Sequence, residues 1–371
     1  MFHLVQQSVE RYLREHDRSD VTTDHVICLD VTNRRIDGYC YLFGSARQFP
    51  QLVAKVARTA EGRAVMETEF ENLRTLQRIG LNEDRVRTPE PLDLRVEDDT
   101  LIALQSALPG TLLKNLRGSK LFSTSRVESV FTQVVDWWTR FVRGFGISRI
   151  RLSDKVYERE VLARVTRFRN SYLLERDQQD LLTRRFEREH PLLSLELPFM
   201  ARHGDFCTAN ITLHETGVAV LDWEFPLTQR MPLFDLLYFF ASTKYPFGGL
   251  RGQSSHFDSF VEVYWGESYF SQAVRRQLLA ACAEFDLPPR VLPDLLLLSL
   301  IEVANMKYEA LVTSHEFDYE DLSDEMATDA EKRRRWDSFR DTDRDEPLAR
   351  IQDGKLPVLD QFLRRGFPEF R

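Results

Sequence analysis

The sequence contains little cysteine, and the cysteines it has are scattered. Its four cysteines follow no regular spacing and form no C-x-x-C pair: Cys28, Cys40, Cys207 and Cys282. A disulfide framework or a zinc ribbon requires cysteines paired at short intervals. The pattern therefore excludes both, and we expect free thiols in a reducing compartment.

The chain also lacks an excess of positive charge and a long apolar run. Its formal net charge is −8 at pH 7, whereas proteins that bind nucleic acid usually carry net positive charge. The most apolar run, Leu295–Val303, contains Glu302 and is too short to cross a bilayer. Charges occur throughout Met1–Asp20, where a secretory signal would need an apolar segment. We expect a cytoplasmic protein that binds neither nucleic acid nor membrane, of undefined oligomeric state.

The first part of the chain is rich in strand patterns. Three β-rich runs, one helical run and two further strand candidates follow one another: Val26–Val31, Tyr39–Phe43, Gln51–Ala57, Arg63–Ile79, Pro91–Val96 and Thr100–Gln105. Turn-forming residues separate them. This order predicts a small antiparallel sheet with one helix packed on it. On that helix, Phe70, Leu73 and Leu76 share a face and are expected to pack beneath the sheet.

The remainder of the chain is mainly helical. Leu108-Pro109-Gly110 resembles a connection, and apolar residues at helical spacing then predict seven helices: Arg126–Phe145, Tyr157–Glu189, Leu233–Tyr245, His256–Trp265, Phe270–Phe285, Pro293–Val312 and Asp329–Arg340. A short hairpin, Asn210–His214 and Val218–Asp222, interrupts them. The sequence predicts an α+β fold of two lobes, an N-terminal lobe of residues 1–108 and a helical lobe of residues 109–371.

The strongest chemical signal is the stretch His203–Asn210, which reads H-G-D-F-C-T-A-N and is followed twelve residues later by Asp222. Phosphoryl transfer from ATP requires a carboxylate facing the acceptor hydroxyl and oxygen ligands for Mg²⁺. An Asp and an Asn five residues apart, on a loop that leads into a hairpin, can supply both. We therefore predict that Asp205 is the catalytic residue and that Asn210 and Asp222 hold the metal.

This pattern, followed by Leu221-Asp222-Trp223-Glu224, resembles the aminoglycoside phosphotransferase and choline kinase family, whose members are small-molecule kinases with a protein-kinase-like fold. The resemblance implies ATP or GTP and Mg²⁺ as cofactors and a small-molecule hydroxyl compound as the acceptor, in the amino alcohol, aminoglycoside or sugar class.

The resemblance also implies roles for residues upstream and downstream of the loop. Lys55, on the third strand, would hold the α- and β-phosphates and pair with Glu69 on the following helix. The backbone of Ser106 and Leu108 would bind the adenine edge, and Asp235 would brace the catalytic loop.

Some positions and some alternatives stay open. The chain has no G-x-G-x-x-G, so the residues that cover the phosphates are unassigned, and Glu67 and Glu71 lie on the same helical turns as Glu69. One alternative is an inactive kinase-like module that binds nucleotide. A second is a metal-dependent hydrolase with ligands His203, Asp205, Asp222 and His214. Six acidic residues between Glu316 and Glu325 read as an exposed loop, or as a surface that attracts a cationic acceptor.

Overall fold

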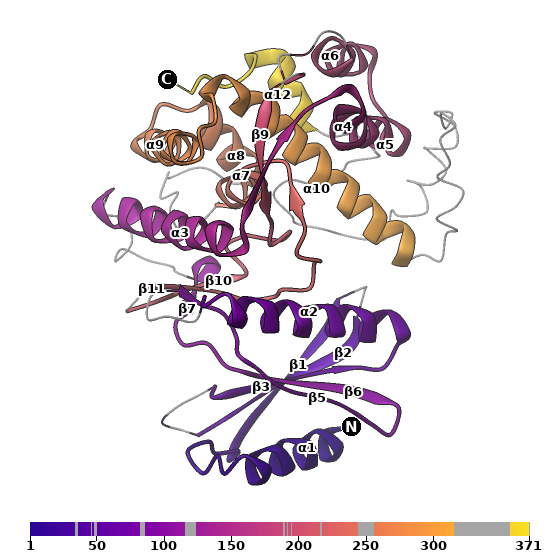
Figure 1. The fold of residues 1–371 in the computed structure, drawn as a ribbon, viewed down its shortest axis with the longest axis vertical. Helices are drawn as coiled ribbons and strands as arrows, with labels where there is room; N and C mark the ends of the chain where they lie inside the picture. Colours follow the sequence, from indigo (N-terminus) through magenta and orange to yellow (C-terminus); the bar gives the residue numbers. More distant parts are fainter. Residues whose placement is uncertain are drawn as a thin grey trace.

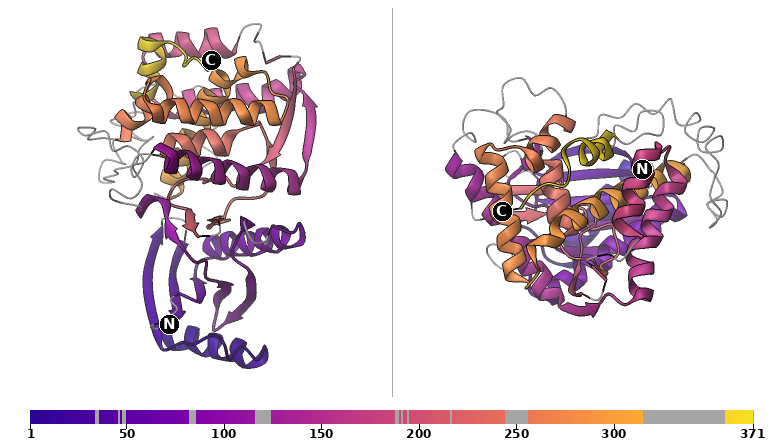
Figure 2. Two further views of the ribbon diagram at one scale, coloured as in Figure 1. Left: turned by 90° about the vertical axis from the view of Figure 1, so that its left-hand side faces the viewer. Right: turned by 90° about the horizontal axis from the view of Figure 1, so that it is seen from above.

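The computed structural model has a smaller β-rich lobe and a larger helical lobe, stacked along the long axis of the molecule (Figure 1). The N-terminus lies in the first lobe and the C-terminus at the far end of the second (Figure 2). The predicted α+β fold class is confirmed. The structure describes residues 1–33, 36–45, 47, 50–81, 86–115, 124–187, 190, 192–193, 195–215, 217–243, 256–314 and 357–370.

The β-rich lobe is built on one five-stranded antiparallel sheet of order β1-β2-β3-β6-β5. Its strands are β1 (His25–Asn33), β2 (Ile36–Gly44), β3 (Leu52–Ala57), β5 (Pro91–Glu97) and β6 (Thr100–Ser106). The central strand β3 pairs with β2 and β6. The predicted strands are therefore present, each within a few residues of its expected limits.

A helix that the sequence analysis missed covers the outer face of this sheet. Helix α1 (Phe2–Glu15) buries Val5, Val9 and Tyr12 against Ala54 and Val56 of β3. Because neighbouring residues of a strand point to opposite faces, Lys55 is directed to the other face of the sheet, where it contacts Glu69 of the next helix. Figure 1 shows that this helix, α2, lies on the side of the sheet that faces the helical lobe.

Helix α2 (Ala60–Arg78) lies between the sheet and the helical lobe (Figure 1). It begins at Thr59, whose side chain accepts a hydrogen bond from the Gly62 amide and so caps the helix. Phe70 packs on the sheet as predicted. The prediction for Leu73 and Leu76 was wrong, because both belong to the apolar core of the helical lobe. The helix therefore contacts both lobes.

The core of the helical lobe forms between α3 (Thr124–Phe145), α7 (Phe234–Ser242) and α10 (Leu292–Ser314). Trp137 and Trp138 of α3 are both buried in it. The remaining helices pack around this centre (Figure 2): α8 (His256–Trp265), α9 (Tyr269–Glu284), the short η4 (Pro289–Val291) and α12 (Pro357–Arg365).

The prediction of one long helix over Tyr157–Glu189 was wrong. This segment contains the end of α4 (Asp154–Tyr157), a π-helical turn (Glu158–Leu162), α5 (Ala163–Ser171) and α6 (Arg176–Phe186). The helix stops where Tyr172 is extended, and a new one starts at Glu175, which forms a capping box with Gln178.

A three-stranded sheet of order β12-β9-β8 was also not predicted: β8 (Ile147–Arg151), β9 (Glu196–Ala201) and β12 (Gln229–Arg230). The expected helix Asp329–Arg340 and the acidic residues from Glu316 to Glu325 lie outside the described residues.

Candidate active site

The predicted chemical residues gather around one short hairpin in the helical lobe. Strands β10 (Ile211–His214) and β11 (Gly217–Val220) pair antiparallel and form a small sheet with β4 (Val86–Arg87) and β7 (Thr111–Leu112), which is followed by the 3-10 turn η1 (Leu113–Asn115). Beyond the last pair of the ladder, the Leu221 amide donates to the Asn210 carbonyl at 2.8 Å. Asn210 and Asp222 are therefore brought to the same open end of the hairpin.

His203 has a structural role in the loop that precedes the hairpin. Its side chain is fully buried; Nδ1 lies 3.2 Å from the Asp205 amide and Nε2 lies 2.8 Å from the Leu221 carbonyl. An N–H must donate and a carbonyl must accept, so Nδ1 is the acceptor and Nε2 carries the proton. With both ring nitrogens bonded to backbone, His203 serves neither as a base nor as a metal ligand.

Asp235, at the start of α7, stabilises the same loop through hydrogen bonds to its backbone. Its carboxylate accepts hydrogen bonds from the amides of His203, at 2.7 Å, and Gly204, at 3.2 Å. It is almost fully buried, and this burial raises the pKa of its carboxyl group, although the two backbone amides act in the opposite direction. The contact matches the bracing role that the resemblance implied.

Glycine is required at position 204. Its φ is +91°, a backbone conformation that disfavours residues with a side chain. A Cβ at this position would lie 2.8 Å from Phe225, closer than carbon atoms can approach. The loop can therefore pass close to the chain after Asp222 only because residue 204 is glycine.

Asp205 and Asn210 are in direct contact. The side-chain amide of Asn210 donates to the Asp205 carbonyl, at 3.0 Å, and to Asp205 Oδ2, at 2.7 Å. Both bonds use the NH₂ group, so the Asn210 amide oxygen is directed elsewhere. This arrangement fixes the Asp205 carboxylate and leaves the amide oxygen as a possible ligand for a cation at the end of the hairpin.

Lys55 connects the two lobes at this end of the hairpin. Its Nζ lies 2.6 and 2.7 Å from the two carboxylate oxygens of Glu69, and 3.4 Å from Asp222 Oδ1. Burial alone would lower the pKa of Lys55, but the carboxylates of Glu69 and Asp222 outweigh it and raise the pKa above its usual value. The sequence predicted this pair. Glu67 and Glu71 are exposed, and Glu71 pairs with Arg74 instead.

The face of the sheet around Lys55 is apolar and open. Val53 lies two residues from Lys55 on the same face, and the strand register places Leu42 and Ile27 beside it. Ile27 and Leu29 are 48% and 45% exposed, which is high for such side chains. Isolated exposed apolar residues need no explanation, but these lie together on one face of the sheet next to a charged side chain.

The segment after β6 offers limited backbone groups. The Ser106 amide donates to the Glu90 carbonyl at 2.9 Å, and the Ala107 amide donates to the Gln51 carbonyl at 3.0 Å. Neither amide is available to a ligand, which leaves Leu108 as the donor in the predicted pair. Two residues after Leu108, Gly110 has a φ of +112°. A Cβ at this position would lie 2.5 Å from the Leu213 carbonyl of β10, so the close approach of these two segments requires glycine.

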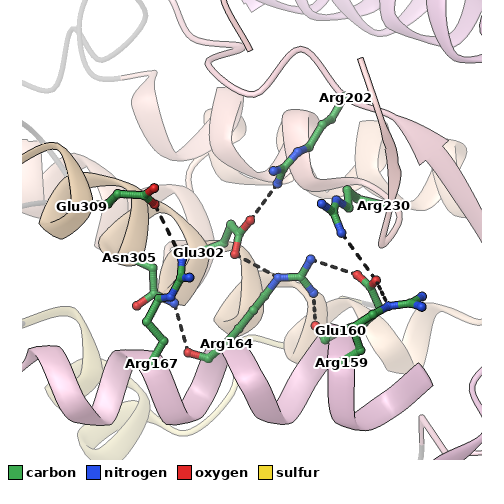
Figure 3. A network of polar contacts seen from close by, with 9 residues as sticks. All are labelled: Arg159, Glu160, Arg164, Arg167, Arg202, Arg230, Glu302, Asn305 and Glu309. Atoms are coloured by element: carbon green, nitrogen blue, oxygen red, sulfur yellow. Dashed lines mark hydrogen bonds and ion pairs between the residues drawn. The ribbon is translucent and has the colours of Figure 1, made fainter. Parts of the chain in front are cut away.

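Two features of the site were missed at the sequence level. Asn72 of α2 donates its side-chain amide to the carbonyls of Trp223 and Phe225, directly after Asp222. The second is a cluster of arginines and glutamates beside the catalytic loop, drawn in Figure 3. The only local signal for Asn72 was its position one helical turn after Glu69. The cluster had no local signal, because it joins residues that are far apart in the chain.

The described residues contain neither a His, Cys, Asp and Glu metal cluster nor a membrane-spanning helix. No three His, Cys, Asp or Glu side chains there lie close enough together to hold a metal ion, so the ligand set His203, Asp205, Asp222 and His214 of the hydrolase alternative is not assembled. No helix among them has the length and apolar character needed to cross a membrane. All four cysteines are free thiols.

Comparison with known proteins agrees with this geometry. The model of the phosphotransferase enzyme family matches residues 37–253. No curated protein sequence matches the chain. The structure resembles the GDP complex of aminoglycoside 2′-phosphotransferase-IIIa, with a TM-score of 0.53 and 13% identity, over 86% of this chain and 94% of that one.

Two weaker likenesses were found. One is aminoglycoside phosphotransferase APH(3″)-Id from Streptomyces rimosus with ADP and streptomycin (TM-score 0.43, 15% identity, 75% of this chain and 95% of that one). The other is glucosamine kinase with glucosamine, ADP and phosphate (TM-score 0.42, 15% identity, 80% and 73%). At these scores neither carries further argument. The family model covers more than half of the chain, and the chain therefore belongs to the phosphotransferase enzyme family.

Proposed function

We propose that this protein is a cytoplasmic kinase that transfers the γ-phosphoryl group of ATP, or GTP, to a hydroxyl group of a small molecule. The observation that carries the proposal is the position of Lys55, whose Nζ contacts Glu69 in one lobe and Asp222 in the other. A lysine placed in this way joins the two lobes at the point where the phosphates of a nucleotide would lie.

The nucleotide would bind between the lobes. Ile27, Leu42 and Val53 would cover the base, because they form the apolar face next to Lys55. The Leu108 amide would donate to the edge of the base and the Ser106 carbonyl would accept from it. The ammonium group of Lys55 would pair with the α- and β-phosphates, while Glu69 keeps it in place.

The residues at the end of the hairpin fit a hard cation. Asp222 offers a carboxylate and Asn210 an amide oxygen, and oxygen ligands are those that Mg²⁺ prefers. When bound, Mg²⁺ would neutralise negative charge on the β- and γ-phosphates. Asp222 is held at this point by a left-handed backbone, with a φ of +65°, which is strained for a residue with a side chain and is typical of functional positions.

Asp205 would act on the acceptor. Its carboxylate is fixed by Asn210 on Oδ2, and no charged group contacts it in the described residues. The acceptor hydroxyl would donate its hydrogen bond to this carboxylate, which orients the oxygen toward the γ-phosphate and takes the proton as the new bond forms.

Two substitutions test the proposal. Asp222→Ala should abolish turnover and weaken Mg²⁺-dependent binding of ATP while the protein stays folded. Asp205→Asn should retain binding of nucleotide and Mg²⁺ but slow the chemical step by about 10²–10⁴-fold. ATP consumption over a panel of hydroxyl compounds and nucleotide titrations measure both. Unchanged turnover in Asp222→Ala would refute the proposal, and nucleotide binding without turnover of any compound would identify an inactive module.

A further inference from the structure

A small pocket lies in the helical lobe. Four of the side chains that line it are drawn in Figure 3. Its walls come from α5, from the residue after β9, from the segment before α7 and from α10, and they include Arg164, Arg202, Arg230, Phe234, Leu298 and Glu302. The volume is about 20 Å³, which is enough for one water-sized group and not for a whole substrate. A ligand would therefore place only one oxygen of an end group inside the pocket, with the rest of that group at its mouth.

Positive charge exceeds negative charge around this pocket. We call Arg159, Arg164, Arg202 and Arg230 the arginine cluster. Glu302 accepts from Arg164 at 2.9 Å and from Arg202 at 2.8 Å. Glu160 accepts from Arg159 and Arg164, both at 2.9 Å. Four guanidinium groups thus share two carboxylates, and Figure 3 shows that they converge on them.

Both carboxylates are ionised at neutral pH. Burial would raise the pKa of Glu302, but the guanidinium groups of Arg164 and Arg202 outweigh it and hold the pKa below its usual range. The pKa of Glu160 is lowered for the same reason, by Arg164 and Arg159 against the effect of burial. In the pocket wall itself, the three guanidinium groups of Arg164, Arg202 and Arg230 face one ionised carboxylate, that of Glu302, and the Asp235 carboxylate lies near Arg202 behind the wall.

Two of the arginines that line the pocket, Arg202 and Arg230, have unused donors. A guanidinium group carries five N–H donors. Arg230 lies 3.6 Å from Glu160, beyond hydrogen-bond distance, and Arg202 makes one hydrogen bond, to Glu302. In both residues Nε is buried and has no partner among the described atoms. A buried donor without a partner is unfavourable, and an oxyanion that entered the pocket would satisfy it.

The pocket is also close to the proposed catalytic residue. Arg202 lies three residues before Asp205, so their Cα atoms are at most about 11 Å apart. Phe234, which lines the pocket and contacts the Arg202 guanidinium across its ring, precedes Asp235, the residue that holds the loop. An anion bound in the pocket would therefore lie next to the segment that leads into the catalytic loop.

We propose that the arginine cluster binds a carboxylate or phosphate group of the acceptor, which is therefore an anionic hydroxyl compound such as a hydroxy acid or a sugar phosphate. Planar guanidinium groups bind such oxyanions through paired hydrogen bonds, and the apolar walls at Phe234 and Leu298 strengthen these bonds by excluding water. Polycationic acceptors such as aminoglycosides are excluded, because the cluster repels ammonium groups. The inference rests on the proposed kinase function.

The test separates the pocket from the reaction. With Mg²⁺ and a non-hydrolysable ATP analogue present in excess, calorimetry measures binding of gluconate, glucose 6-phosphate, glucose and kanamycin to the full chain; turnover with ATP is measured in parallel. Gluconate tests a carboxylate and glucose 6-phosphate a phosphate, while glucose is the neutral control. We expect binding and turnover of one anionic compound, and neither for kanamycin.

Arg230→Gln should then weaken binding of the anionic compound about 10- to 100-fold, as expected for the loss of a charge-assisted contact, with the affinity for the ATP analogue unchanged. Arg149→Gln is the matched control, because Arg149 is equally exposed (40% against 39%) and pairs with Asp286 outside the pocket. The Arg149→Gln variant should bind the anionic compound with the same affinity as the parent protein.

Each other outcome contradicts the inference. Equal binding by the parent and Arg230→Gln, preference for glucose or kanamycin, or no binding of either anionic compound at millimolar concentration would overturn it. Turnover of a neutral or cationic acceptor would overturn the inference about the arginine cluster but would support the kinase function. Binding of the anionic compound without any turnover would uphold the pocket and count against the kinase function.

Discussion

Asn72 and Trp223 join the two lobes next to the proposed metal site: the side-chain amide of Asn72 donates to the Trp223 carbonyl at 2.7 Å. The same amide donates to the Phe225 carbonyl at 2.8 Å. Trp223 follows Asp222 directly, and Asn72 lies one turn after Glu69 on α2. The contact therefore fixes Glu69, and through it Lys55, relative to Asp222.

Removal of this contact should loosen the nucleotide site. Asn72→Ala leaves two carbonyls without their buried donor, which should lower the free energy of unfolding by about 1–3 kcal/mol. It should also raise the KM for ATP several-fold, because α2 no longer holds Glu69 against Lys55. Urea unfolding and steady-state kinetics measure the two effects. Gln77→Ala, an exposed position on the same helix, should change neither; an unaltered KM in Asn72→Ala would show that α2 is fixed by Leu73 and Leu76 alone.

The lysine itself should resist replacement by arginine. Lys55 presents a compact charge to Glu69 and Asp222, whereas a guanidinium group is larger, planar and directional. We expect Lys55→Arg to raise the KM for ATP strongly and Glu69→Gln to raise it more mildly, since the lysine still contacts Asp222 in the second variant. Glu71→Gln, which alters only a surface pair with Arg74, is the control. A larger effect of Glu71→Gln than of Glu69→Gln would mean that the pair is wrongly assigned.

The pair that Glu302 forms with Arg164 and Arg202 should make stability depend on pH. The pKa of Glu302 is lowered in the folded protein, so its contribution to stability is present above its unfolded value, about 4.3, and is lost as the pH falls through the folded value. Glu302→Gln should be less stable than the parent by roughly 2 kcal/mol at pH 7. The difference should begin to shrink as the pH falls below about 4.3 and should be lost only below the lowered folded pKa, where the parent also carries a neutral side chain.

Unfolding by urea at several pH values measures this difference. The control is Glu309→Gln on the same helix, whose exposed pair with Arg167, at 3.6 Å, should contribute less than about 1 kcal/mol at any pH. A stability difference for Glu302→Gln that stays constant from pH 7 down to acid conditions would show that the carboxylate charge does not stabilise the fold.

Local patterns predicted the sheet and the chemical loop, because both are encoded by neighbouring residues. The alternation in β3 directs Lys55 to one face, and the spacing of Asp205, Asn210 and Asp222 is set by one loop and one hairpin. Glu69 was implied by the resemblance to the family, and its position beside the apolar stripe of α2 that includes Phe70 agreed with that role. The strands and the loop needed only a few consecutive residues and the period of the element that holds them.

The features that were missed depend on contacts between distant segments. Helix α1 is fixed by the outer face of a sheet that forms later in the chain. The break between α5 and α6 is stabilised where Tyr172 donates to the Ala304 carbonyl, more than a hundred residues away. The hydrogen bond between Arg202 and Glu302 likewise joins two segments that are distant in the sequence. In each case the local sequence is also compatible with another structure, and packing decides between them.

The catalytic loop provides a last prediction, which separates backbone strain from steric contact. Gly204 and Gly146 both have left-handed backbones, with φ of +91° and +97°. A Cβ at Gly146 would meet nothing within 4 Å, whereas a Cβ at Gly204 would lie 2.8 Å from Phe225. Gly146→Ala should therefore lower the free energy of unfolding by only about 1 kcal/mol, the cost of placing alanine in a left-handed backbone. Gly204→Ala should lower the free energy of unfolding by more, because either the loop or the segment that contains Phe225 has to move.

That movement should appear in the kinetics. Displacement of the Gly204 segment breaks its amide contact with Asp235 and shifts Asp205, and an error of about 1 Å in a reacting group lowers rates by about 10²-fold. We expect kcat to fall by that amount in Gly204→Ala and to stay near the parent value in Gly146→Ala. If both variants lost the same stability and kept the parent kcat, the approach of the loop to Phe225 would have no part in placing Asp205.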